Sequence, residues 1–147
     1  MFGFKKGSYH REVVNKLGKS ALAFEERFTF YVTNKGRALD GSTRQVLIPD
    51  WKKHVQDMQF LLGCINGGAT ATAPADGLYF DTIDDQAVEV WEKTVLVYSF
   101  IQRQPFRENL PALRALMHKF GRETNQGAIY FEFDGFAYQI NEPYDPL

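Results

Sequence analysis

The chain has 147 residues, of which 44% are hydrophobic, 24% charged and 15% aromatic. A chain of this length suits one domain and buries roughly two-thirds of its unfolded surface, so its stability requires no disulfide or metal. The net charge of −1 argues against a general nucleic-acid binder, and the single cysteine excludes an intrachain disulfide and a thiolate zinc site. We expect that cysteine, Cys64, to be buried, as free cysteines usually are.

The N-terminal residues 1–20 form a basic arm, in which five Lys and Arg residues face one Glu. We expect either a solvated extension, with or without a short helix, or an arm that contacts a partner or subunit. Residues 21–147 are predicted to form one domain. The arm has no apolar core of the secretory kind and no apolar run approaches about 18 residues, so we expect a cytoplasmic protein without a membrane span.

The first half of the domain predicts a strand, a loop and a helix. Residues 27–32 alternate large apolar and polar side chains, which indicates a strand with one buried face. The glycine-rich polar stretch 34–43 predicts a loop. A helix is predicted from 49 to 65, because Pro49 suits a first helical turn and the apolar residues fall on one stripe. The stripe consists of Trp51, Val55, Met58, Leu62 and Ile65.

The second half predicts further strands and one helix. Residues 64–79 read as a strand of small side chains, and 92–101 as a strand with two apolar faces, which is typical of a central position. The stretch 107–121 predicts an amphipathic helix ending at a glycine. Residues 127–140 predict a β-hairpin, because an Asp-Gly pair at 134–135 suits a two-residue type I′ turn.

Taken in order, these elements form a β-α-β-β-α-β series with an added C-terminal hairpin strand. The predicted fold is therefore α+β and ferredoxin-like, an antiparallel sheet with two helices on one face. The other face is rich in aromatic residues, so we expect an oligomer contact to bury it.

Several familiar sites are absent from the sequence. There is no Walker-type phosphate loop, no GxGxxG, no HExxH and no nucleophile elbow. The three histidines do not cluster, and His54 and His118 fall beside helix stripes, where a boundary residue is commoner than a ligand. We expect no metal and no cofactor.

The segment CINGGATATAPADGLY, residues 64–79, combines two features of a binding surface. Gly67 and Gly68 allow close approach of a ligand or backbone. Thr70 and Thr72 offer hydroxyls on one face, while alanines keep the other face thin. The resulting trough has two interpretations. A neighbouring subunit or the second helix fills it, or an adenine ring or small ligand does.

Tyr79 ends this strand and Glu92 begins the next one. Antiparallel pairing places the two ends together, and a phenol ring beside a carboxylate suits a cationic ligand. The alternative is that Glu92 pairs with Lys93 or Arg27 at the surface, which contributes little.

Over about residues 27 to 133, beginning with the strand that contains "FYV", this pattern resembles the small bacteriophage enzymes that degrade S-adenosylmethionine, the SAM lyases, formerly called SAM hydrolases. The resemblance rests on the "GG" and small-residue strand ending in "GLY", followed by "EKTVLV". It implies a ferredoxin-like trimer that binds its adenosyl substrate between subunits, with Tyr79 and Glu92 as catalytic residues. The implied reaction releases methylthioadenosine as homoserine lactone forms, in the cytoplasm of a bacterial host if the gene is a phage's.

Two other functions fit the same sequence. Similar strands occur in trimeric nitrogen-regulatory (PII-like) sensors, which bind nucleotides between subunits without consuming them. In either case Gln126 and Arg122 are candidate polar contacts at a subunit edge. The third possibility is a structural or interaction protein whose trough and arm only dock partners.

Overall fold

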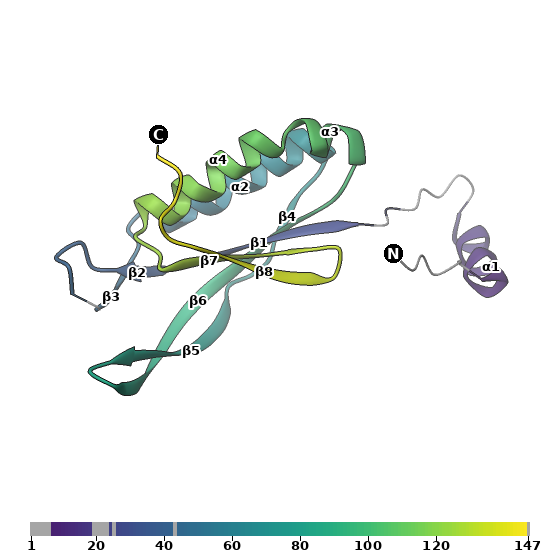
Figure 1. The fold of residues 1–147 in the computed structure, drawn as a ribbon. Coiled ribbons are helices and arrows are strands. Elements are labelled where there is room, and N and C mark those ends of the chain that lie inside the picture. The colour runs from purple at the N-terminus through teal and green to yellow at the C-terminus, as the bar shows by residue number, and fades with distance from the viewer. Residues whose placement is uncertain (1–6, 19–23, 25, 43, 147) are drawn as a thin grey trace.

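A computed structural model describes residues 7–18, 24, 26–42 and 44–146. Figure 1 shows two long helices lying side by side over a twisted sheet. In chain order the elements are α1 (Ser8–Leu17), β1 (Arg27–Thr33), β2 (Lys35–Arg37), β3 (Gln45–Leu47), α2 (Trp51–Asn66), β4 (Thr70–Ala71), β5 (Ala75–Ile83), β6 (Gln86–Phe100), α3 (Arg103–Glu108), α4 (Leu110–Glu123), β7 (Ala128–Phe133) and β8 (Phe136–Asn141).

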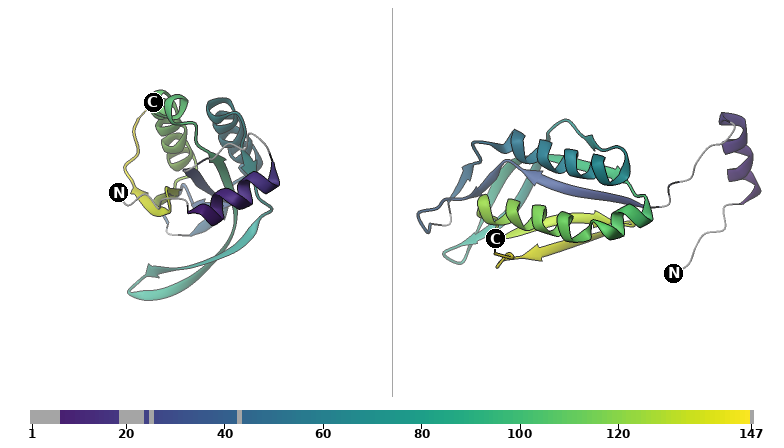
Figure 2. Two further views of the ribbon diagram at one scale, coloured as in Figure 1. Left: turned by 90° about the vertical axis from the view of Figure 1, so that its right-hand side faces the viewer. Right: turned by 90° about the horizontal axis from the view of Figure 1, so that it is seen from above.

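The sheet order confirms the predicted α+β fold. The main sheet runs β4-β6-β1-β7-β8, with β5 also paired to β6, and its pairings are antiparallel. Helices α2 and α4 lie on one face and leave the other face open (Figure 2). This is the ferredoxin-like arrangement with β8 as the additional hairpin strand. Strand β6 has partners on both sides, so the predicted central strand is confirmed.

The core lies between the sheet and the two helices because the predicted apolar stripes meet there. On β1, Phe28, Phe30 and Val32 are each at most 3% exposed. The ring of Phe30 meets that of Phe120 on α4 edge-on, with centroids 5.7 Å apart. Met58 of α2 also belongs to this core and is 1% exposed. The alternation in the strand and the 3.6-residue spacing in the helix therefore predicted correctly that these residues are buried.

The predicted loop at 34–43 contains a strand, which is a correction. Lys35–Arg37 pairs with Gln45–Leu47 as the small hairpin β2–β3. A tertiary contact rather than local propensity holds it there: Gly36 is buried against the backbone of Thr124, which follows α4. Sequence periodicity cannot reveal so short a strand.

We predict that Gly36→Ala destabilises the protein by about 1–3 kcal/mol, the usual cost of overpacking. A Cβ at this position would overlap the carbonyl oxygen of Thr124, so β2 must move away from the end of α4. Urea unfolding measures the change. Gly127→Ala is the matched control, because a Cβ there meets no atom within 4 Å. Equal stability of the two variants would contradict the prediction.

The segment 64–79 is not one strand. It divides into β4 and β5 around Pro74, which has no N–H for the ladder. Strand β5 then continues to Ile83, and the chain turns at Asp84 and Asp85, both with positive φ. Glu92 consequently lies inside β6 rather than at its start. The predicted hairpin turn at 134–135 is confirmed, with positive φ at both residues.

Three smaller predictions are also corrected. Cys64 is exposed, because it lies off the buried stripe of α2. The predicted helix 107–121 is two helices, α3 and α4, separated at Asn109. Gly121 is inside α4 rather than its cap, and it makes room for the ring of Tyr144, which a Cβ would approach to 2.6 Å.

The N-terminal arm contains α1, none of whose residues is buried. The predicted boundary between arm and domain, at residues 20 and 21, lies outside the described residues. Among the described helices, none combines the length and apolar composition that a membrane crossing requires.

Candidate functional site

A cleft of about 710 Å³ lies on the side of the sheet opposite the helices. It forms where the long β5–β6 hairpin extends past the rest of the sheet, beside β2–β3 (Figure 1). Of the residues predicted from sequence to form the site, Tyr79, Glu92 and Gln126 line it. Its walls also include Tyr31, Thr33, Arg37, Gln45, Thr94, Asn125, Tyr130 and Gln139.

Strand register brings Tyr79 and Glu92 together. Glu92 is opposite Gly77 and Tyr79 is opposite Val90, so Tyr79 and Glu92 are diagonal neighbours on one face. Such neighbours have Cα atoms about 7–8 Å apart, within reach of long side chains. Gly77 lies against the side chain of Glu92, since a Cβ there would be in van der Waals contact with the Glu92 Cγ at 3.4 Å.

Glu92 is a half-buried carboxyl group without a partner. Burial raises its pKa to about 7, and the positive charge of Lys35 opposes that rise. Within the described residues, no hydrogen bond or ion pair reaches its carboxylate. The surface pairing considered above is not formed, because Lys93 pairs with Asp76 and Arg27 lies over the ring of Tyr98.

Tyr79 remains a neutral phenol at physiological pH. Burial and, second, the negative charge of Glu92 raise its pKa to about 12. The side chain is 37% exposed, so its ring is open to the cleft. The pair therefore offers a carboxylate, a hydroxyl donor and an aromatic ring, which together suit a cation.

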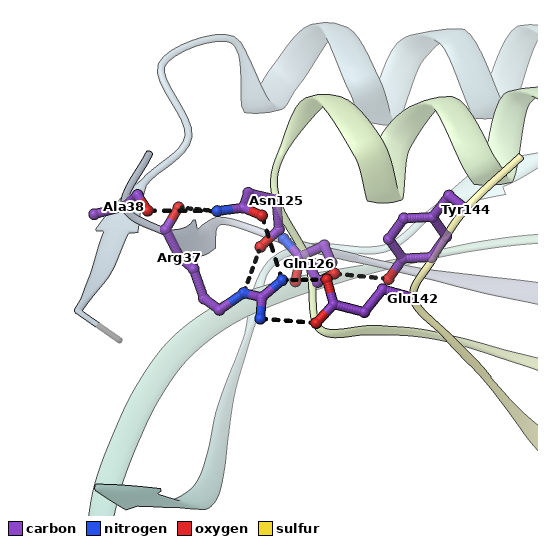
Figure 3. A network of polar contacts seen from close by, with 6 residues as sticks. All are labelled: Arg37, Ala38, Asn125, Gln126, Glu142 and Tyr144. Carbon is purple, nitrogen blue, oxygen red and sulfur yellow. Dashed lines mark hydrogen bonds and ion pairs between the residues drawn. The ribbon is translucent and has the colours of Figure 1, made fainter. Parts of the chain in front are cut away.

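The end of the cleft beside β2 is held by a polar network (Figure 3). Arg37 donates to both carboxylate oxygens of Glu142 at 2.9 and 2.5 Å and to the carbonyl oxygen of Asn125 at 3.3 Å. Hydrogen bonding to Arg37 lowers the pKa of Glu142, so the pair stays charged. The hydroxyl of Tyr144 donates to the carbonyl oxygen of Gln126 at 2.9 Å. These bonds join β2, the turn after α4 and the C-terminal segment at this wall.

Gln126 builds the wall through its side chain as well. Its Nε2 donates to the carbonyl oxygen of Lys35 at 2.8 Å and to the hydroxyl of Thr124 at 3.1 Å. The amide thus ties β2 to the end of α4. Its contact with a substrate stays a prediction.

The remaining predicted residues lie outside this cleft, at the β4 edge. Gly67, with φ 87°, ends α2, and the carbonyl of Gly68 accepts a 2.6 Å bond from Ser99. Thr70 pairs with β6, and the hydroxyl of Thr72 accepts a backbone N–H of β6 at 3.0 Å. The structure assigns these groups to the sheet, so a ligand role for them also stays a prediction.

Sequence reasoning missed the wall formed by Arg37 and Asn125. Arg37 is on the strand that was predicted as a loop, so nothing pointed it toward the site. Asn125 carried one usable signal: it follows a helix and precedes Gly127, as residues with positive φ often do, and its φ is 51°. Within the described residues, no cluster of three or more His, Cys, Asp or Glu could hold a metal ion.

No protein-family model matches the chain, and no curated protein matches it. Two solved structures do. A phage SAM lyase in complex with S-methyl-5'-thioadenosine is 15% identical, with a TM-score of 0.52 over 84% of this chain and 95% of that one. The fold is that of the phage SAM lyases. An apo phage SAM lyase agrees, at 14% identity and a TM-score of 0.52 over 87% and 98% of the two chains.

The match to the phage SAM lyases confirms at the level of the fold the resemblance found in the sequence. It covers most of both chains, so the common part is the domain rather than one motif.

Proposed function

We propose that the chain is a SAM lyase, which cleaves S-adenosylmethionine to methylthioadenosine and homoserine lactone. The observation that carries the proposal is the unpartnered, half-buried carboxylate of Glu92 beside the phenol of Tyr79. A carboxylate in that position is stabilised by a cationic ligand, and the substrate carries two cations, a sulfonium and an ammonium. The phage SAM lyase solved with S-methyl-5'-thioadenosine supports an adenosyl ligand in this fold.

The reaction needs no added reactant. One oxygen of the substrate's carboxylate attacks its own Cγ, the Cγ–S bond breaks, and the bonding electron pair stays on sulfur. The products are neutral methylthioadenosine and homoserine lactone, which keeps the ammonium. No proton is gained or lost, so the protein must supply only shape and electrostatics.

The loss of charge during the reaction decides how each side chain acts. The sulfonium and the attacking carboxylate neutralise each other in the transition state, so a cleft with little water favours the reaction. A carboxylate held against the sulfonium would stabilise the substrate more than the transition state. Glu92 therefore acts best on the ammonium, whose charge persists. The ring of Tyr79 packs against the methionine part of the substrate and holds it in its reactive conformation.

In this proposal the cleft is completed by a neighbouring copy. Tyr79 is 37% exposed and the cleft opens to solvent on the face that the helices leave bare. A second copy over that face would exclude water, as the reaction requires. We propose the homotrimer that the sequence resemblance implies.

The test is incubation of the purified protein with S-adenosylmethionine, followed by chromatography for methylthioadenosine and homoserine lactone. Release of both in equal amounts supports the lyase. Homoserine without lactone at the earliest times would indicate attack by water instead. The absence of turnover, with a melting temperature raised by ATP or ADP, would favour the nucleotide-sensing alternative.

We predict that S-adenosylmethionine binds more tightly as the pH rises from 5 to 7. Glu92 is protonated below its pKa of about 7 in the free protein and then attracts no cation. Only its ionised form attracts the ligand. As the pH rises toward that pKa, the dissociation constant falls by about tenfold per pH unit, and above the pKa it levels off. Calorimetry at several pH values measures this, with neutral methylthioadenosine as the control ligand. Equal slopes for the two ligands would contradict the role of Glu92.

A further inference from the structure

On the β5–β6 hairpin, the side chains that alternate with Tyr79 and Glu92 form a second surface, two of whose residues, Leu78 and Phe80, also border the cleft. Leu78 is opposite Trp91, and Phe80 lies on the same face two residues along. Their side chains are 43%, 54% and 63% exposed. We call these three residues the hairpin face. Exposed large apolar side chains gathered in this way are typical of an interaction site.

Acidic residues lie at the tip end of the hairpin face, and the Asp76–Lys93 ion pair lies at its other end. Glu89 is directly opposite Phe80, and the turn at the tip consists of Asp84 and Asp85, which are exposed. A partner for this surface must therefore be apolar at its centre and basic at its edge.

The same chain has such a surface elsewhere. An apolar cavity of about 900 Å³ lies between α3–α4 and strands β7 and β8. It exists because β8 widens the sheet beyond the width that two helices cover, so Phe136 and Tyr138 of β8 are 66% and 46% exposed on that side. We call it the helix groove. Its apolar lining includes Phe106, Leu110, Met117, Phe131, Phe133 and Ile140.

Arginines form the edge of the helix groove. Arg103 and Arg114 pair with Glu26 and Asp145, respectively. Arg107, also on this edge, is exposed and makes no ion pair within the part of the chain that the structure describes. The charge at this edge thus complements that of the acidic hairpin.

We propose that the hairpin face of one copy docks in the helix groove of the next copy. Phe80 and Trp91 are the anchors, since large aromatic side chains in apolar pockets dominate such interfaces. The acidic residues at the tip then lie near Arg107. The contact joins two different surfaces, so it repeats head to tail and builds either a closed ring or an open filament.

The hairpin of a molecule cannot reach its own groove. Ile101, just past the end of β6, lines the groove, whereas Phe80 pairs with Glu89 twelve residues earlier. At about 3.3 Å per residue the two are roughly 40 Å apart along the strand. Figure 1 shows α3 and the hairpin tip at opposite ends of the sheet.

The test compares assembly mass by light scattering for full-length variants. Phe80→Ser with Trp91→Ser alters the hairpin face and leaves the helix groove intact. Leu110→Asp alters the helix groove, where Leu110 is 45% exposed, and leaves the hairpin face intact. Each is expected to remove the hairpin–groove contact and to lower the mass below that of the wild type at micromolar concentration. Phe60→Ser, on a 76% exposed side chain of α2, is the control and keeps the wild-type mass.

Mixing the two dissociated variants separates docking from misfolding. The first keeps an intact groove and the second an intact hairpin face, so together they form one contact. We expect the mixture to have a higher mass than either variant alone. Arg107→Glu is expected to weaken assembly, and Glu89→Arg in the same chain to restore it.

Three results would overturn the proposal: a monomeric wild type, a mass that neither variant changes, or no complex on mixing. A monomeric wild type whose groove binds the dye anilinonaphthalene sulfonate would instead indicate a small anionic amphiphile. Assembly and S-adenosylmethionine turnover are measured separately. Turnover without this contact would contradict the docking proposal and support the lyase, and the contact without turnover would do the reverse.

Discussion

Glu92→Gln is expected to lower kcat/KM for S-adenosylmethionine by about 10²-fold or more, the usual effect of a misplaced substrate group. Glutamine keeps the size of the side chain and removes the charge that would hold the ammonium. The loss should appear in both KM and kcat, since the ammonium contact both binds the substrate and orients it. Initial rates of methylthioadenosine release measure the change.

The same substitution should leave the fold intact. In the wild type the raised pKa of Glu92 means that the ionised group is less stable in the folded protein than in the unfolded chain. Its contribution to stability is therefore lost as the pH rises from about 4.5 to about 7. At pH 8 we expect Glu92→Gln to melt at the wild-type temperature or above it. Glu123→Gln, exposed on α4, is the control for both readouts. Unchanged turnover in Glu92→Gln would remove this residue from the site.

Phe30→Ala is expected to destabilise the fold by about 3–5 kcal/mol, the usual cost of removing a buried aromatic ring. Phe30 is 1% exposed at the centre of β1, and its ring packs edge-on against Phe120. The cavity left behind lies between sheet and helix, where neither can collapse without breaking strand pairing. Domains are stable by only about 5–15 kcal/mol, so the variant should be close to unfolding at 37 °C.

Denaturant unfolding measures this loss, and Phe60→Ala provides a control with the same chemistry. Phe60 is 76% exposed on α2, so its removal should change stability by at most about 0.5 kcal/mol. A small effect at Phe30 would mean that the core is not where the structure places it.

Much of the fold could be predicted because the apolar residues in its longer strands and helices recur at a regular spacing. Strand β1 alternates and helix α2 has one apolar stripe, so each has a single face that can be buried. The turn at Asp134 and Gly135 was predictable for a local reason, namely that few residues tolerate positive φ. The order of these elements then leads to the ferredoxin-like sheet.

The pairing of Tyr79 with Glu92 is partly a sequence property. Both residues lie on strands joined by a short turn, so their proximity follows from the hairpin. Their register does not, because one residue of slip would place them on opposite faces. The turn at Asp84 and Asp85 sets that register, and only the structure shows where the turn is.

The sequence by itself determined the elements with a clear period, the absence of common catalytic motifs and the two residues proposed for the site. Only the tertiary structure decided that Gly36 packs on Thr124, that Cys64 is exposed, and that Arg37 closes the cleft with Glu142. The physical reason is distance along the chain. Periodicity reports which face of an element is buried, whereas Arg37 and Glu142 are 105 residues apart and meet only after the sheet has formed.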